Sequence, residues 1–290
     1  MFGRIVLLSL IFACSMGQMI SITVFQPKLD TLTPTKASQL AALDSAAKVA
    51  SESGSILLMV PELYLTGYNL AAASGAEPAY GASYKVVSGI AARHNVSILF
   101  TYPEDGGNGA IFDAAALIYR NGSTLASYRK VNLAAGENAF FTPGDQFAPI
   151  VDLDGVKVGI LICFDIFLPE PARILAIRGA QMILIPTANG YPPGIRNQLS
   201  DLIVPTRALE NNAITAYVNW LQDIDGSPAY LHFYGQTKVA DWGGSTLYSG
   251  PAADSALQQV SFNISQWPGP STASSRPAAD LKGLCGNFSH

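Results

Sequence analysis

The chain has 290 residues, of which 49% are hydrophobic and 13% charged, and its formal net charge is -4 at pH 7. This composition excludes intrinsic disorder, which requires low hydrophobicity and high net charge. No run of Lys and Arg exceeds two residues, so we expect no nucleic-acid partner. The 26 Gly and 18 Pro are close to ordinary usage, which excludes a collagen-like or low-complexity chain.

The amino-terminal segment has the pattern of a secretory signal. Arg4 is followed by an apolar stretch at 5–13 and by the small residues Ser15 and Gly17. A bilayer span needs about 20 apolar residues, so this stretch is too short to cross a membrane. We therefore expect residues 1–17 to be a signal peptide and the protein to be secreted or extracytoplasmic.

Two other interpretations of this segment stay open. Met19 could be the true start, which would make the protein cytoplasmic, or Cys14 could carry a lipid, although Phe12 fits that motif poorly. Asn-X-Ser sequons would support secretion only in a eukaryotic source, and they lie at Asn95, Asn121, Asn263 and Asn287.

The chain then alternates strands and helices. Residues 20–25 are apolar and predict a strand. A helix should start with Thr33 as its cap and Pro34 at its first position, and should end at Gly54. The apolar run at 56–60 predicts a buried strand. This β-α-β order is typical of a layered α/β domain.

The middle of the chain predicts two hairpins, and the α/β alternation then returns. The hairpins join 114–119 to 124–130 around Asn121-Gly122, and 147–153 to 156–162 around Asp154-Gly155. Further helices are expected at 84–94, 169–178 and 196–211, and further strands at 97–102, 182–186, 214–220, 235–240, near 247 and at 257–262. We predict one domain at 18–266 and a loose carboxy-terminal extension at 267–290.

Four residues could carry chemistry. Cys163 ends a buried strand just before a helix, where a nucleophile is exposed beside backbone N–H groups that can bind an oxyanion. Glu62 and Lys130 also end predicted strands, and Glu137 lies in a loop. Taken singly, Cys163 is more typical of a small buried hydrophobe, and each of the others is more typical of a solvated charge. Together they supply a nucleophile, a cation and a base.

Several other kinds of site are excluded or not expected. The three cysteines and three histidines lack the spacing of a disulfide framework or a zinc motif, so we expect no metal and no cofactor. A Ser-His-Asp hydrolase of the α/β type would need a G-x-S-x-G turn, which the sequence lacks. The glycine cluster at 106–109 matches no phosphate-binding loop.

Three segments carry a resemblance to a known family. The segments 61–68 (PELYLTGY), 128–133 (YRKVNL) and 161–165 (LICFD) resemble the three signatures of the nitrilase superfamily of carbon–nitrogen hydrolases. The resemblance extends over roughly residues 20 to 265. It implies an α/β fold, a four-layer α-β-β-α sandwich, which in this family is usually paired face to face into homodimers or larger homo-oligomers.

The resemblance also implies roles for the four residues. Cys163 corresponds to the nucleophile, Glu62 to the general base, Lys130 to the cation beside the tetrahedral intermediate, and Glu137 to a second glutamate that positions substrate. The implied reaction converts a small-molecule amide to a carboxylic acid plus ammonia or an amine through a Cys thioester. A free thiol has a pKa of about 8.5, so we expect the carboxylate base and the lysine charge to activate it.

The residues after the nucleophile favour the amidase-like branch, because nitrilases usually have Trp-Glu where this chain has Phe164-Asp165. Asn132 stands where amidases commonly have His, which puts the local loop in question. The segment 166–167 has no Arg or Lys, so an acidic substrate is not expected. We expect an apolar substrate pocket lined by Tyr68, Phe164, Asn189 and Tyr191. The alternatives are nitrile or carbamoyl hydrolysis at the same site, or a non-catalytic binding protein on this fold.

Overall fold

The computed structural model describes residues 17–31, 33–69, 72–190, 199–222 and 232–270. Residues 1–16 of the predicted signal, Tyr191, Cys14, Cys285, Asn287 and residues 271–290 of the predicted extension lie outside this part of the chain. Within it, no helix has the length and apolar character that crossing a membrane requires.

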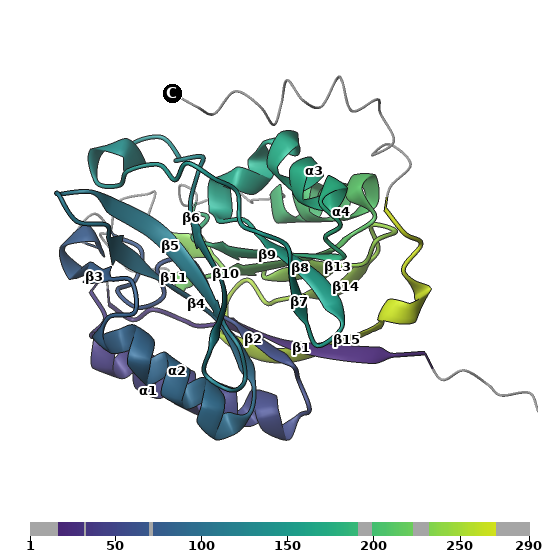
Figure 1. The fold of residues 1–290 in the computed structure, drawn as a ribbon, viewed down its shortest axis with the longest axis horizontal. Helices are drawn as coiled ribbons and strands as arrows, with labels where there is room; N and C mark the ends of the chain where they lie inside the picture. The colour runs from purple at the N-terminus through teal and green to yellow at the C-terminus, as the bar shows by residue number, and fades with distance from the viewer. Residues whose placement is uncertain (1–16, 32, 70–71, 191–198, 223–231, 271–290) are drawn as a thin grey trace, which may run out of the picture.

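The first sheet has seven strands, in the order β15-β1-β2-β4-β5-β6 with β3 paired to β4. Two helices, α1 (Lys36–Glu52) and α2 (Ala82–His94), cover its outer face (Figure 1). The strands are β1 (Met19–Gln26), β2 (Leu57–Met59), β3 (Glu77–Pro78), β4 (Ser97–Asp105), β5 (Ile111–Ile118), β6 (Thr124–Arg129) and β15 (Ala256–Asn263).

The second sheet has six strands, in the order β14-β13-β10-β9-β8-β7. Its outer face is covered by α3 (Pro169–Ile177) and α4 (Leu199–Asn211). The strands are β7 (Val151–Leu153), β8 (Val156–Ile160), β9 (Met182–Thr187), β10 (Ile214–Asn219), β13 (Lys238–Ala240) and β14 (Thr246–Ser249). A separate pair consists of β11 (Leu221–Gln222) and β12 (Phe233–Tyr234).

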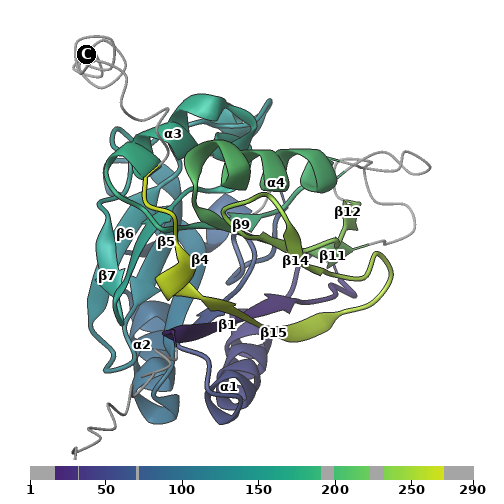
Figure 2. The same ribbon diagram turned by 90° about the vertical axis from the view of Figure 1, so that its right-hand side faces the viewer.

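The layers stack as helix, sheet, sheet, helix, as Figures 1 and 2 show. One apolar core lies between the two sheets and includes Val24, Leu99 and Ile160. A second core packs α1 and α2 on the first sheet, and a third packs α3 and α4 on the other. This arrangement confirms the predicted four-layer α-β-β-α fold. Because both faces of each sheet are covered at its centre, the central strands β2, β9 and β10 are buried along their whole length, whereas β6, β14 and β15 are only partly buried.

The strand directions gather polar ends at one edge of the first sheet. The strands β1, β2 and β4 are parallel, β5 is antiparallel to β4, and β6 is antiparallel to β5. The residue after β2, the start of β5 and the end of β6 therefore lie at the same edge. In the second sheet, β8, β9 and β10 are parallel, so their carboxyl ends also share one edge.

Some predicted boundaries were wrong. The first helix begins at Lys36 and its cap is Thr35, whose side chain accepts a hydrogen bond from the Ser38 N–H. The Thr33-Pro34 pair also fits the pattern of a cap followed by Pro, so the predicted cap lies two residues before the observed one. The strand predicted at 147–153 is only Val151–Leu153, and β3, β11 and β12 were not predicted. Strands of two residues are too short to show any periodicity.

Leu43 tests the packing of α1 on the first sheet. Its side chain is fully buried in the core beneath this helix. Leu43→Ala should lower the free energy of unfolding by about 2–5 kcal/mol, because it removes buried methyl groups and leaves a cavity. Val49 lies on the exposed side of the same helix, and Val49→Ala should cost less than about 0.5 kcal/mol. Urea unfolding measures both, and equal losses would contradict this packing.

Candidate active site

A buried ammonium group lies at the centre of the polar cluster. The Lys130 side chain, which directly follows β6, has no exposed surface. Its Nζ donates to Glu62 Oε1 at 2.6 Å and to Glu137 Oε1 at 2.8 Å. Burial alone would lower the pKa of Lys130, but the charges of Glu62, Cys163, Glu137 and Asp113 raise it well above its ordinary value. The lysine is therefore a permanent cation.

Glu62 is held from both sheets. It follows β2 of the first sheet, and its Oε2 accepts a hydrogen bond of 2.7 Å from the Ala188 N–H, just beyond β9 of the second sheet. Its carbonyl oxygen accepts the Trp220 Nε1–H at 2.7 Å. The side chain is fully buried. The carboxylate thus has one oxygen on Lys130 and the other on a backbone donor, which fixes its orientation.

Glu137 lies in the turn η2 (Glu137–Ala139) and completes the environment of the lysine. Its Oε1 also accepts the Tyr68 hydroxyl at 2.5 Å, and its Oε2 accepts the Ala134 N–H at 2.7 Å. Burial acts to raise the pKa of Glu137, but the Lys130 charge and the hydrogen bonds from Lys130, Tyr68 and Ala134 lower it overall. This carboxylate stays ionised, so it holds Lys130 and does not act as an acid.

Cys163 begins the turn η3 (Cys163–Phe167), three residues after the end of β8. Its φ is 45°, a left-handed conformation that is uncommon for a residue other than Gly and that marks functional turns. Among the residues that the structure describes it is the one cysteine, its thiol is free, and it is 7% exposed. The sulfur also receives a hydrogen bond from the Ala188 N–H, the donor that contacts Glu62.

Burial has the largest effect on the Cys163 thiol. Burial raises the pKa of Cys163 well above its ordinary value, and the charges of Glu62 and Glu137 add to this increase. The Lys130 charge lowers the pKa but does not outweigh the other effects. The resting sulfur therefore keeps its proton, and the site needs a base beside it rather than a preformed thiolate.

Asp165 ties the lysine segment to the cysteine turn. Its Oδ2 accepts from the Tyr128 hydroxyl at 2.7 Å and from the Ile162 N–H at 2.9 Å. Its Oδ1 accepts from the backbone N–H and the side-chain amide of Asn132, at 2.9 and 2.8 Å. Asn132 therefore has a well-defined place in the loop after Lys130, although amidases commonly have another residue there. The fully buried Asp165 fixes both segments at once.

Arg207 on α4 supports the cysteine turn from the outer layer. Its Nε donates to the Ile166 carbonyl at 2.9 Å, and its Nη2 donates to the Phe167 carbonyl at 3.1 Å. Its Nη1 pairs with Glu210 at 3.0 Å. These carbonyls end a short 3₁₀ turn, where the helix itself offers no donor. The turn that carries Cys163 is thus held by side chains from two layers.

A cavity of about 260 Å³ opens beside the buried cluster. Its walls are mostly apolar, and Glu137 and Tyr68 connect it to Lys130. It is lined by Tyr68, Asn69, Ala135, Gly136, Glu137, Phe140 and Phe141. Of the four residues predicted to bind substrate, Tyr68 lines this cavity. Phe164 stacks on Phe167 in the cysteine turn, and Asn189 follows β9, where its N–H bonds to the Asn219 side chain at 2.9 Å.

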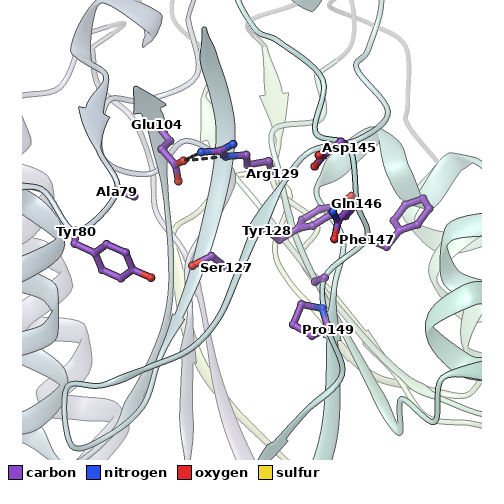
Figure 3. A pocket seen from close by; sticks show the side chains of 11 residues that line it. Ala79, Tyr80, Glu104, Ser127, Tyr128, Arg129, Asp145, Gln146, Phe147 and Pro149 are labelled. Atoms are coloured by element: carbon purple, nitrogen blue, oxygen red, sulfur yellow. Dashed lines mark hydrogen bonds and ion pairs between the residues drawn. The ribbon is translucent and has the colours of Figure 1, made fainter. Parts of the chain in front are cut away.

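A second cavity, of about 360 Å³, is lined by none of the four predicted catalytic residues. Figure 3 shows it with Tyr80 and Ser127 on one side and Gln146, Phe147 and Pro149 on the other. Arg129 and Glu104 point toward one another there, and Arg129 Nε donates to Glu104 Oε1 at 2.9 Å. These two charges satisfy each other, and the third charged residue of the lining is the exposed Asp145.

Sequence reasoning missed Asp113, which lies in β5 and is 1% exposed. Its Oδ2 is 3.5 Å from Lys130 Nζ, so it is a third carboxyl group beside the ammonium. The oxygens of Glu62, Asp113 and Glu137 lie within 4.8 Å of one another, an arrangement that could hold a metal ion. In this chain the Lys130 ammonium supplies the positive charge among them. The sequence feature that could have indicated Asp113 is the position of this single acid directly before the Ala run at 114–116.

Comparison with known proteins identifies the family. The model of the carbon-nitrogen hydrolase family matches residues 21–266, which is most of the chain. The chain belongs to the carbon–nitrogen hydrolase family. This membership confirms the resemblance seen in the three sequence segments and makes the protein an enzyme of this class.

Curated relatives of this carbon–nitrogen hydrolase include an (R)-stereoselective amidase from a Pseudomonas species. It is 31% identical over 212 residues, which are 72% of this chain and 74% of the relative. A nitrilase from Pyrococcus abyssi is 32% identical over 67% of this chain and 71% of its own length. A hydrolase from Pseudomonas protegens is 38% identical over 66% of each chain, so the chain spans just under two thirds of that relative.

Solved structures agree with the fold of this hydrolase. An amidase from Nesterenkonia sp. AN1 superposes with a TM-score of 0.79 and 29% identity, over 91% of this chain and 96% of the other. A mutant of that amidase was solved with the acetamide moiety of fluoroacetamide added covalently at its active-site cysteine, and it superposes with a TM-score of 0.78. A cysteine mutant was solved with butyramide, with a TM-score of 0.77.

The Asp165 network generates a test of how this hydrolase builds its site. Asp165→Asn replaces one acceptor oxygen with an amide that faces N–H donors, so it should lower the free energy of unfolding by about 1–3 kcal/mol. Asp152 is exposed and accepts one hydrogen bond, from Gly155, so Asp152→Asn should cost less than about 1 kcal/mol. Urea unfolding compares them, and an Asp165 variant as stable as wild type would contradict the network.

Proposed function

We propose that this carbon–nitrogen hydrolase cleaves a small neutral amide through a thioester on Cys163, with Glu62 as general base and Lys130 and Glu137 as partners. The observation that carries the proposal is the buried Lys130 ammonium, bonded to Glu62 and Glu137 and close enough to Cys163 to lower the pKa of its thiol. A cation, a base and a nucleophile excluded from water are the groups that acyl transfer needs.

In the first half of the reaction, Glu62 takes the thiol proton as the sulfur attacks the amide carbon. The negative charge that develops on the amide oxygen is stabilised by the Lys130 ammonium and by the backbone N–H of Phe164, near the start of the turn. The proton on Glu62 then passes to the leaving nitrogen, the carbon–nitrogen bond breaks, and ammonia or an amine departs. The acyl group remains on Cys163 as a thioester.

In the second half, Glu62 takes a proton from water, and the resulting hydroxide attacks the thioester carbon. The carbon–sulfur bond breaks, the carboxylic acid leaves, and the proton returns to the sulfur. Glu137 stays ionised throughout, because its low pKa leaves it no proton to give. Its part is to hold Lys130 and, through Tyr68, one wall of the cavity.

The cavity supports a small neutral substrate. Its described lining includes three aromatic side chains, Tyr68, Phe140 and Phe141, and its one charged residue is the carboxylate Glu137. A negatively charged acyl group would be repelled there, which agrees with the lack of Arg or Lys at 166–167. Amidase structures at 29% identity, one with a covalent acetamide moiety and one with butyramide, also favour short aliphatic amides.

A homodimer is part of this proposal, with α4 as the contact surface. Leu202 and Leu209 on this helix are 60% and 58% exposed. They are seven residues apart, which places them on the same side of a helix. Large exposed apolar side chains gathered on one face are typical of an interaction surface, and face-to-face pairing is what the family resemblance implies.

Turnover tests the mechanism directly. Ammonia release should be measured with short aliphatic amides, amino-acid amides, carbamoyl compounds and nitriles. Cys163→Ala should lower kcat by at least about 10³-fold, and Glu62→Gln should also lose orders of magnitude, because both remove groups that act on the reacting bond. Cys285→Ala is the matched control and should keep wild-type activity. Activity retained by Cys163→Ala would contradict the mechanism, and release from nitriles alone would reassign the substrate.

The subunit contact has its own test. Wild type should elute by light scattering at twice the 30.6 kDa chain mass or more. Introducing Leu202→Glu and Leu209→Glu together should shift the protein to the mass of one chain, because paired carboxylates would then face each other across the contact. Val49→Glu, on the exposed side of α1, is the control and should leave the mass unchanged. A monomeric wild type would contradict the proposed contact.

A further inference from the structure

Asp113 is a buried acid that the proposed mechanism does not use. It lies in β5, its side chain has no exposed surface, and neither of its oxygens has a hydrogen-bond donor. The nearest donor is Lys130 Nζ, 3.5 Å from Oδ2, which is too long for a good hydrogen bond. A buried carboxylate without a donor is costly, so the arrangement calls for an explanation.

The backbone fixes Asp113 beside the catalytic groups. The Lys130 N–H donates to the Asp113 carbonyl at 2.8 Å, continuing the pairing of β5 with β6. The titratable groups that face Asp113 come from three other elements: Lys130 after β6, Glu62 after β2 and Glu137 in η2. The carboxyl oxygens of Asp113, Glu62 and Glu137 lie within 4.8 Å of one another. Three carboxyl groups therefore surround one ammonium.

The charges of this cluster do not balance if every carboxyl is ionised. Three carboxylates and one ammonium would leave two excess negative charges in a site closed to water, where an unpaired charge is very unfavourable. Glu137 is ionised, and Glu62 accepts hydrogen bonds at both oxygens, from Lys130 and Ala188. Asp113 is the carboxyl that accepts no hydrogen bond, so it is the one that can carry a proton at least cost.

The direction of the acid's titration agrees with this geometry. Burial raises the pKa of Asp113 well above its ordinary value, and the Glu62 charge, a side-chain hydrogen bond with Glu62 and the Glu137 charge raise it further. The Lys130 charge lowers it but is outweighed. With a proton, Asp113 becomes a donor to Glu62, and two facing acceptors become a hydrogen-bonded pair.

We propose that Asp113 is a positioning residue that remains a neutral acid, donates a hydrogen bond to Glu62, and keeps the cluster at one excess negative charge instead of two. This inference rests on the proposed function, because its effect is on the base that activates Cys163. An ionised Asp113 would add a second excess negative charge to the cluster around Lys130, whose positive charge lowers the pKa of the Cys163 thiol, and would so disfavour the thiolate. The neutral acid orients Glu62 without that penalty.

The experiment compares two substitutions at this position. Asp113→Asn keeps the size and offers an N–H donor to Glu62, but it cannot ionise. Asp113→Ala removes the donor altogether. Asp145→Asn, which changes an exposed acid in the same way, is the control. The first readout is the rate at which iodoacetamide alkylates Cys163 as a function of pH, quantified on the Cys163 peptide by mass spectrometry. The second is kcat on the amide that the ammonia-release measurements select from the panel.

If Asp113 is neutral, Asp113→Asn should alkylate at pH 7 within about threefold of wild type, because no charge is lost, and it should keep kcat within about tenfold. Asp113→Ala should lose more than about tenfold in kcat with little change in KM. In wild type, kcat should fall at alkaline pH as Asp113 ionises, and in Asp113→Asn this loss should be absent.

Three results would overturn the proposal. The first is alkylation of Asp113→Asn at pH 7 more than about tenfold faster than wild type, with the apparent pKa of Cys163 lowered by about one unit or more, because a negative charge would then have been removed. The second is a wild-type kcat in Asp113→Ala. The third is an unchanged alkaline limb in Asp113→Asn.

Alkylation needs no substrate, so a wild type that hydrolyses no amide would count against the proposed function alone. If Asp113→Ala does not fold, the alkylation rate and the alkaline pH dependence of Asp113→Asn still test the proposal.

Discussion

The structure depends on one buried cation. The Lys130 ammonium is excluded from water, and it is tolerable there only because carboxylates from separate elements contact it. This requirement brings together the end of β6, the segment after β2 that carries Glu62, and the turn η2. Once they are there, Glu62 and Lys130 lie beside Cys163, which comes from the other sheet. The need to neutralise the buried charge of Lys130 therefore also determines the geometry of the candidate site.

The two sheets contribute unequally to that point. The first sheet supplies Glu62, Asp113 and Lys130, whereas the second supplies Cys163 and the Ala188 N–H that contacts both the sulfur and Glu62. The core between them contains apolar side chains from both sheets, such as Val24, Leu99 and Ile160. Asp165 adds polar bonds across the same interface, from Tyr128 of β6 to the cysteine turn. A shift of one sheet along the other would therefore break these bonds together, which makes the relative position of the sheets sharply defined.

The sequence predicted the fold where a pattern is long or a motif is specific, and it singled out Glu62, Lys130 and Glu137, which the structure brings into contact. Local sequence patterns predicted the strands β1 and β4 and the turns at Gly122 and Gly155, because these elements follow backbone preferences. The contact of Asp113 with Lys130 and the hydrogen bonds of Asp165 could not be predicted from the sequence. They join residues that are distant in the chain, and no local sequence pattern indicates such contacts. The state of the Cys163 thiol depends on burial, which spacing alone does not show. The cap at Thr35 was misplaced because Thr33-Pro34 fits the same local rule.

The pairing of β1 with β15 affects how the protein is made. These strands are antiparallel over eight residue pairs, from Met19 opposite Asn263 to Gln26 opposite Ala256, and they lie side by side in Figure 2. About 240 residues separate the partners, so this closure is among the most non-local contacts in the chain. During synthesis on the ribosome, the edge of β1 that pairs with β15 lacks its partner until almost the whole chain has been translated. An exposed strand edge of this kind invites pairing with other chains. The last strand of the domain therefore also ends the period in which the nascent protein is most open to aggregation.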